Sequence, residues 1–89
     1  MQNIQNLELR LKTLGNQRRL VILKEIQKRK GATVSEISEN TGISITAVSQ
    51  HLRALRSVDL VTFTRRGMYV SYRLPLKKDP LLKIVLEEL

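Results

Sequence analysis

The first thirty residues carry two runs of apolar side chains at the three- and four-residue spacing of an amphipathic α-helix. Gly15 and Gly31 interrupt the pattern, so each helix is predicted to end at a glycine. Asn16 is suited to cap the second helix because its side-chain oxygen can accept a hydrogen bond from a free backbone amide. The apolar positions of the two helices are Ile4, Leu7, Leu11 and Leu14, then Leu20, Val21, Ile22, Leu23 and Ile26.

Two more helices follow, joined by a turn of a few residues. Thr33 and Glu36 have the spacing of a capping box, which predicts the start of a short third helix. Gly42 supplies the positive φ that a sharp turn between two helices requires. Ser44 then caps a fourth helix, predicted over residues 45–57. The predicted apolar face of this helix is Ile45, Val48, Leu52 and Leu55.

After Asp59 the apolar period changes from 3.6 residues to 2, the alternation of a β-strand. Gly67 interrupts the alternation, so residues 62–73 are predicted to form a β-hairpin. Arg65 and Arg66 stand beside this glycine and give the hairpin a basic tip.

A last helix is predicted to begin with Asp79 as its cap and Pro80 as its first residue. Its apolar side chains cover more than one face, which is typical of a terminal helix that packs on another chain. A chain of 89 residues buries only about 60% of its unfolded surface, so a lone monomer would be marginally stable. We therefore expect a homodimer formed through the first and last helices. The expected dimer residues are Ile4, Leu7, Leu11, Leu82, Val85, Leu86 and Leu89.

The order of these elements predicts a mainly α-helical fold, a winged helix-turn-helix in which the hairpin is the wing. Residues 1–89 show no linker or repeat, which indicates a single DNA-binding domain. The fourth helix would enter the major groove of double-stranded DNA. The side chains opposite its apolar face, which can hydrogen-bond to base edges, are Thr46, Ser49, Gln50 and Arg53.

The excess of basic over acidic residues indicates that the chain binds a polyanion. The chain has 16 Lys plus Arg against 8 Asp plus Glu, a formal net charge of +8. Residues 31–76 contain arginine but no lysine, and arginine offers the planar donors that suit base edges and narrow grooves. Arg53 is predicted to contact bases, and Arg56 to meet phosphate or solvent. Arg65 and Arg66 are predicted to contact the minor groove or its phosphates.

Several classes of function are not expected. The chain lacks cysteine, which excludes disulfides and thiolate metal sites and fits a cytoplasmic protein. Its longest apolar run, residues 20–23, is far shorter than the roughly 20 residues that span a bilayer. His51 is the only histidine, and we expect it to have a structural or phosphate-contacting role. We therefore expect no enzyme, no metal, no cofactor and no membrane partner.

Residues 9–74 contain two stretches, LKTLGNQRRLVILKEI and TVSEISENTGISITAVSQHLRALRSVDLVTFTRRGMYVSYRL. They resemble the ArsR-type metalloregulators, small dimeric winged-helix repressors of bacteria and archaea. The most specific part is SITAVSQHL at residues 44–52. The resemblance implies dimerisation through the first and last helices and base contacts from Ile45, Thr46, Ser49 and Gln50. The full set of expected DNA-contacting residues is Ser44, Ile45, Thr46, Ser49, Gln50, Arg53, Arg56, Arg65 and Arg66.

The chain departs from that family where its members sense metals. Residues 33–37 carry no cysteine, and residues 79–89 offer only Asp79, Glu87 and Glu88 where other members have His and carboxylate pairs. Persulfide and arsenic sensors also need cysteine. What remains is a constitutive regulator, one controlled by an unidentified organic ligand or partner protein, or a small regulator from a mobile element.

The leading hypothesis is a homodimeric, sequence-specific transcription regulator, a repressor that occludes a promoter by binding a pseudo-palindromic operator. A first alternative is a winged-helix module for protein–protein interaction, in which the polar face of the fourth helix does not face DNA. A second is a non-specific architectural DNA binder, for which loss of Gln50 would weaken binding to all duplexes alike.

Overall fold

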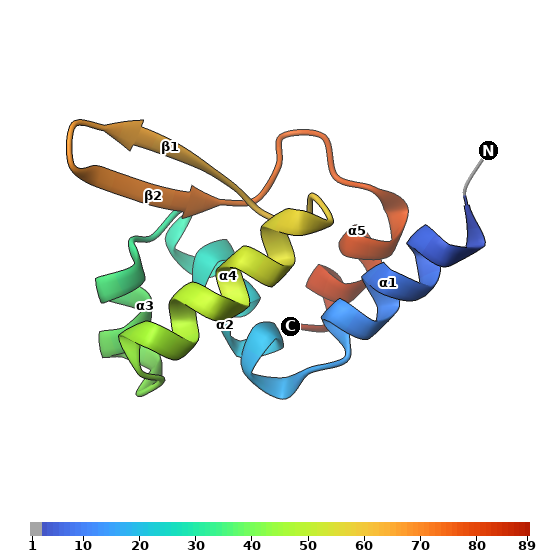
Figure 1. Ribbon diagram of the computed structural model, residues 1–89, viewed down its shortest axis with the longest axis horizontal. Helices are drawn as coiled ribbons and strands as arrows, with labels where there is room; N and C mark the ends of the chain where they lie inside the picture. The colour runs from blue at the N-terminus through green and yellow to red at the C-terminus, as the bar shows by residue number, and fades with distance from the viewer. Residues whose placement is uncertain (1–2) are drawn as a thin grey trace.

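The computed structural model describes residues 3–89, so positions 1 and 2 of the predicted domain lie outside the described residues. Within that part of the chain, five helices and one antiparallel hairpin follow each other in the predicted order (Figure 1). The elements are α1 (Ile4–Leu14), α2 (Gln17–Arg29), α3 (Val34–Thr41), α4 (Ile45–Ser57), β1 (Thr62–Arg66), β2 (Tyr69–Arg73) and α5 (Pro80–Glu88). The fold is a winged helix-turn-helix, with α3 and α4 as the helix-turn-helix and the hairpin as the wing.

Side-chain caps fix where the helices begin. Asn16, Ser44 and Asp79 each accept a hydrogen bond from a backbone N–H in the first turn of the helix that follows, as predicted. The predicted capping box also forms: the Thr33 hydroxyl accepts from the Glu36 N–H at 3.1 Å, and the Glu36 carboxylate accepts from the Thr33 N–H at 2.8 Å. These bonds satisfy amides that a helix leaves free. The backbone hydrogen bond from Thr33 also lowers the pKa of Glu36.

The core is centred on α2, which packs against α3, α4 and α5. The buried stripe of α2 is narrower than predicted. Ile22, Leu23 and Ile26 are fully buried, whereas Leu20 is half-buried and Val21 is exposed. The remaining core residues come from every other helix, the α2–α3 connector and the segment before β1, and they are Leu14, Ala32, Ile37, Val48, Leu52, Leu55, Val58, Leu60, Val61, Leu82 and Leu86.

The turn between α3 and α4 is held by hydrogen bonds on both sides of Gly42. This glycine has φ 75°, and its amide donates to the Ser38 carbonyl at 2.9 Å. The Ser38 hydroxyl donates to the Ile43 carbonyl at 2.6 Å, and the Ile43 amide donates to the Thr41 hydroxyl at 3.2 Å. These bonds fix the direction in which α4 leaves α3.

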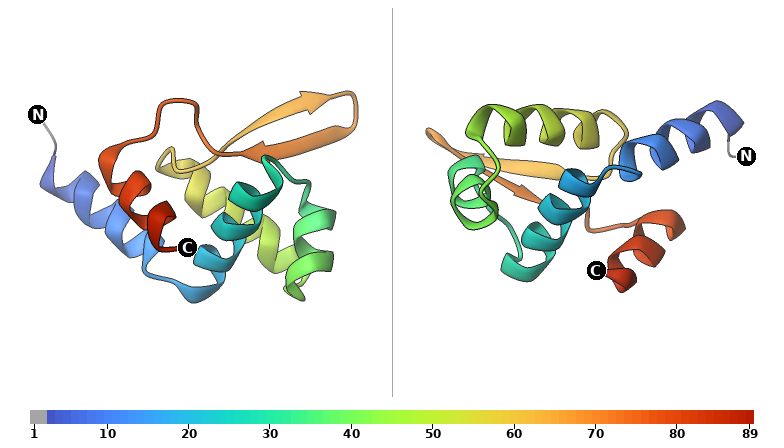
Figure 2. Two further views of the ribbon diagram at one scale, coloured as in Figure 1. Left: turned by 180° about the vertical axis from the view of Figure 1, so that it is seen from behind. Right: turned by 90° about the horizontal axis from the view of Figure 1, so that it is seen from below.

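Helices α1 and α5 share the end of the molecule opposite the tip of the wing (Figure 2). Arg10 of α1 forms an ion pair at 3.0 Å with Asp79, the cap of α5, and Arg10 is only 6% exposed. Because Arg10, Thr13 and Leu14 face inward, most of the predicted apolar face of α1 points outward instead. Its exposed members are Ile4, Leu7 and Leu11.

The prediction that Leu82 and Leu86 lie in a dimer interface is wrong. Both side chains are buried within the single chain, where they belong to its own core. The error arose because α5 is apolar on more than one side, and spacing alone does not tell which side faces inward. Val85 and Leu89 are half-buried at the margin of that core, whereas Ile84, which was not predicted, is 61% exposed.

Candidate nucleic-acid interface

Helix α4 is anchored on one side and open on the other. Val48, Leu52 and Leu55 are fully buried, as predicted, and they hold the helix against the core. Ile45 was predicted to share this apolar face but is 56% exposed. It stands in the first turn of α4, next to the exposed Thr46, where the chain's resemblance to the ArsR-type regulators implies a base contact.

Most of the other predicted α4 contacts are also accessible. The Ser44, Gln50, Arg53 and Arg56 side chains are exposed, and Ser49 is half-buried. The Ser44 hydroxyl also accepts a hydrogen bond from the Ala47 amide at 3.1 Å, so this residue serves as the helix cap. The structure therefore places an exposed and mainly polar face opposite the buried face of α4.

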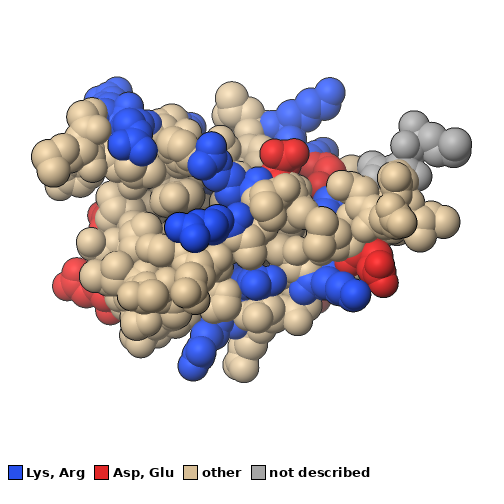
Figure 3. All heavy atoms as spheres, viewed as in Figure 1, with Lys and Arg blue, Asp and Glu red and all other residues tan. Residues whose placement is uncertain are grey.

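The wing carries its basic residues near the tip. Arg66 pairs with Tyr69 across the hairpin, so Gly67 and Met68 form the two-residue turn. Arg65 and Arg66 are both exposed. In Figure 3, the charged side chains over the wing tip and the middle of α4 are Lys and Arg, while Asp and Glu lie toward the edges of this face and the root of the wing. The wing tip and α4 thus present basic side chains on the same face of the molecule, which attracts phosphate.

Arg56 makes a contact that the sequence did not predict. Its guanidinium carbon lies 4.1 Å from the centroid of the Phe63 ring in β1, a cation–π contact. The C-terminal end of α4 therefore touches the root of the wing.

His51 connects α4 to α2. The Arg19 Nε group donates a hydrogen bond to His51 Nδ1 at 3.2 Å, and Arg19 Nη1 donates to the Thr13 carbonyl at 3.3 Å. Burial and the positive charges of Arg19 and Arg18 lower the pKa of His51. A neutral imidazole can accept the bond from Arg19, so the geometry gives His51 a structural role.

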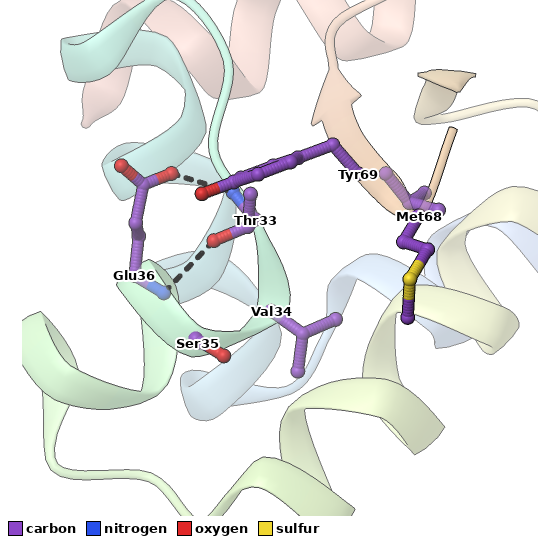
Figure 4. A pocket seen from close by; sticks show the side chains of 7 residues that line it. Thr33, Val34, Ser35, Glu36, Met68 and Tyr69 are labelled. Atoms are coloured by element: carbon purple, nitrogen blue, oxygen red, sulfur yellow. Dashed lines mark hydrogen bonds between the residues drawn. The ribbon is translucent and has the colours of Figure 1, made fainter. Parts of the chain in front are cut away.

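An open groove separates the N-terminus of α3 from the tip of the wing (Figure 4). Its lining residues are Thr33, Val34, Ser35, Glu36, Met68, Tyr69 and Val70. The polar atoms of Thr33 and Glu36 are engaged in the capping box, which Figure 4 shows as dashed lines. Across residues 3–89, no group of three or more His, Cys, Asp or Glu side chains could hold a metal ion. None of the helices described for this span is long and apolar enough to cross a membrane.

Comparison with known proteins identifies the family. The family model described as bacterial regulatory protein, arsR family, matches residues 16–62. The chain belongs to the arsR family. The matched segment of this arsR-family chain begins at the cap of α2 and includes all of the helix-turn-helix. The expected fold and family are therefore confirmed.

Individual relatives agree with this assignment. The arsR-family chain is 32% identical over 62 residues to the HTH-type transcriptional regulator YgaV of Escherichia coli (strain K12), a match that covers 70% of the chain and 63% of YgaV. It therefore spans less than two thirds of the length of that relative. The transcriptional repressor PagR of Bacillus anthracis has a similar structure, with a TM-score of 0.79 and 25% identity over 96% of this chain and 93% of PagR.

A further similar structure is a homodimeric winged helix-turn-helix DNA-binding domain, Mb0332 of Mycobacterium bovis, a possible ArsR-family transcriptional regulator. Its TM-score is 0.81 at 28% identity, over 96% of this chain and 76% of that chain. The similarity to Mb0332 thus extends over nearly the whole arsR-family chain.

Proposed function

We propose that the chain is a homodimeric, sequence-specific repressor that binds a pseudo-palindromic operator in double-stranded DNA. The observation that carries the proposal is the exposed polar face of α4, which is held by buried Val48, Leu52 and Leu55 and lies on the same side of the molecule as the basic wing. The names of the relatives support it, since YgaV is a transcriptional regulator, PagR a repressor and Mb0332 a homodimeric DNA-binding domain. Such a protein acts on double-stranded DNA in the cytoplasm.

The side chains of α4 match the chemistry of the major groove. Gln50 can form two hydrogen bonds with adenine, and Arg53 can form two with guanine. Thr46 is short and lets the helix approach the bases closely, while the exposed Ile45 offers an apolar contact to a thymine methyl group. Each good bidentate pair discriminates against a wrong base by about 1–3 kcal/mol.

A dimer explains the apolar surface at the other end of the molecule. The exposed apolar side chains of α1 and α5 include Ile4, Leu7, Leu11 and Ile84. A two-fold axis at the α1–α5 end of the molecule would bury these side chains in both copies of the chain. The same axis would present the two copies of α4 to successive major grooves, about 34 Å apart. The corrected interface therefore contains Ile84, with Val85 and Leu89 at its margin, in place of Leu82 and Leu86.

Selection from a random duplex library tests the function. The full chain should enrich an inverted repeat with half-sites about one helical turn apart. Gln50→Ala should then relax the preference at one base position in each half-site, while Gln27→Ala, at an exposed glutamine of α2, should leave it unchanged. If no inverted repeat is enriched at moderate salt, the protein-interaction alternative is favoured. Equal weakening of all duplexes by Gln50→Ala would indicate an architectural binder.

A further inference from the structure

The two strands of the wing are held unequally by the rest of the chain. β1 is exposed except at Phe63, and β2 is half-buried at Val70, Ser71 and Tyr72, on the side that meets α2 and α3. A two-stranded hairpin is marginally stable by itself in water. The direction in which the wing points must therefore be set at its root, where it meets the rest of the chain.

On one side of the root, the wing is tied to the connector between α2 and α3. The Tyr72 amide donates to the Ala32 carbonyl at 2.8 Å, and the Ala32 amide donates to the Tyr72 carbonyl at 2.9 Å. The neighbouring Gly31 allows this close approach, since a Cβ there would lie 3.2 Å from the Ser71 hydroxyl oxygen. This bridge anchors β2 but leaves β1, which forms the other edge of the hairpin, to be held by different contacts.

On the other side, β1 meets the end of α4. Phe63 pairs with Tyr72 across the hairpin, and the two rings lie 5.7 Å apart at 53°. The guanidinium of Arg56 covers the Phe63 ring at 4.1 Å. A continuous series of contacts thus runs from α4 through Arg56, Phe63 and Tyr72 to Ala32, across the full width of the root.

We propose that Arg56 is a positioning residue, which stacks on Phe63 to fix the angle between the wing and α4. This role rests on the proposed DNA-binding function, because that angle decides whether the wing reaches the minor groove beside the major groove that α4 enters. Arg56 would then act on DNA through the wing, rather than through the phosphate contact that its charge alone predicts. A planar guanidinium suits the task because it can stack on a ring and remain hydrated at its edge.

Residual dipolar couplings in the free 89-residue chain test the positioning role without DNA. Arg56→Gln and Phe63→Leu should both change the orientation of the hairpin amides relative to those of α4. Phe63→Tyr keeps the aromatic face and should retain the wild-type couplings, as should Arg53→Gln, which removes an exposed arginine from the preceding turn. Wild-type hairpin couplings in Arg56→Gln would overturn the proposal.

Binding to the selected operator gives a second test. Arg56→Gln and Phe63→Leu should each weaken binding by about 2- to 5-fold, the range expected for an exposed cation–π contact. The double variant should be no more than about twofold weaker than either single variant, since both remove the same contact. Thermal unfolding of Phe63→Leu checks that the rest of the fold is intact.

A phosphate contact by Arg56 predicts a different result. Phe63→Leu would then bind with wild-type affinity, and Arg56→Gln alone would lower the log–log salt slope by about 0.9. That outcome would contradict the positioning role. If the wild-type chain bound no duplex at all, the proposed function would fail, while the dipolar couplings would still decide the role of Arg56 in the free protein.

Discussion

Helix α5 has two apolar faces, and substitutions on each face should have different effects. Leu82→Ala removes a side chain that is fully buried within the chain. Substitutions of this kind cost about 2–5 kcal/mol in the free energy of unfolding. In a domain of this size each kcal/mol lowers the Tm by roughly 4–8 °C, so the Tm of Leu82→Ala should fall by at least about 8 °C.

Ile84→Ala should instead weaken the dimer. Because Ile84 is 61% exposed, it contributes little to folding of the single chain, about 0.5 kcal/mol or less. Full burial of a side chain of this size stabilises by about 1.5–3 kcal/mol, and a two-fold axis buries it twice. Because part of the Ile84 side chain is already buried in the single chain, Ile84→Ala should weaken the free energy of dimerisation by about 2–3 kcal/mol. This change raises the dimer Kd roughly 30- to 150-fold.

Sedimentation equilibrium over a range of protein concentrations measures the dimer Kd, and thermal unfolding at the same concentrations measures the Tm. Gln27→Ala, at an exposed position of α2, is the control for both measurements. The assignment of the two faces is refuted if Ile84→Ala dimerises with the wild-type Kd, or if Leu82→Ala unfolds at the wild-type Tm.

Three further predictions concern single side chains. His51 has a lowered pKa, so as the pH falls its imidazole is protonated in the unfolded chain before it is protonated in the folded chain. The stability that His51 contributes is therefore present above about pH 6.5 and is lost as the pH falls below that value. Urea unfolding of His51→Gln over the same pH range should not show this loss. Gly42→Ala should lower the free energy of unfolding by about 1 kcal/mol, because alanine disfavours the φ of 75° at this position. Crowding is not the cause, since a Cβ at residue 42 would meet nothing within 4 Å. Gly42→Asn should lower the free energy of unfolding by less, and equal losses for the two variants in urea unfolding would contradict this reasoning. Asp79→Asn keeps an oxygen that can cap α5 but removes the carboxylate that pairs with the buried Arg10. The free energy of unfolding, measured with urea, should therefore fall by about 1–3 kcal/mol. An unchanged urea midpoint would show that the ion pair does not stabilise the fold.

The order of the elements could be predicted from the sequence because local signals agree with the fold. Caps at Asn16, Thr33, Ser44 and Asp79 lie where the helices begin, and the change of period after Asp59 marks the start of the wing. These signals act over three or four residues, so they are visible without knowledge of the tertiary structure.

Which side of a helix faces inward was harder to predict. Helix α5 is apolar on two sides, so spacing alone could not separate the buried Leu82 from the exposed Ile84. In α1 the inward side includes Arg10, which forms an ion pair with Asp79 at the other end of the chain. Long-range partners of this kind leave no periodic signal.

In the candidate DNA-binding site, too, local features could be predicted from the sequence and long-range contacts could not. The exposed polar positions of α4 could be predicted because they lie opposite a clear apolar face. Ile45 was predicted to belong to the apolar face but is exposed. The contact of Arg56 with Phe63 could not be predicted, because a strand contributes the ring and a helix contributes the charge.

Amide chemical-shift mapping during titration with the selected operator tests most directly whether α4 and the wing bind DNA. The largest changes should fall on Thr46, Gln50 and Arg53 of α4 and on Arg65 and Arg66 of the wing, and they should saturate at one duplex per dimer. Saturable changes confined to surfaces away from α4 and the wing would contradict the account.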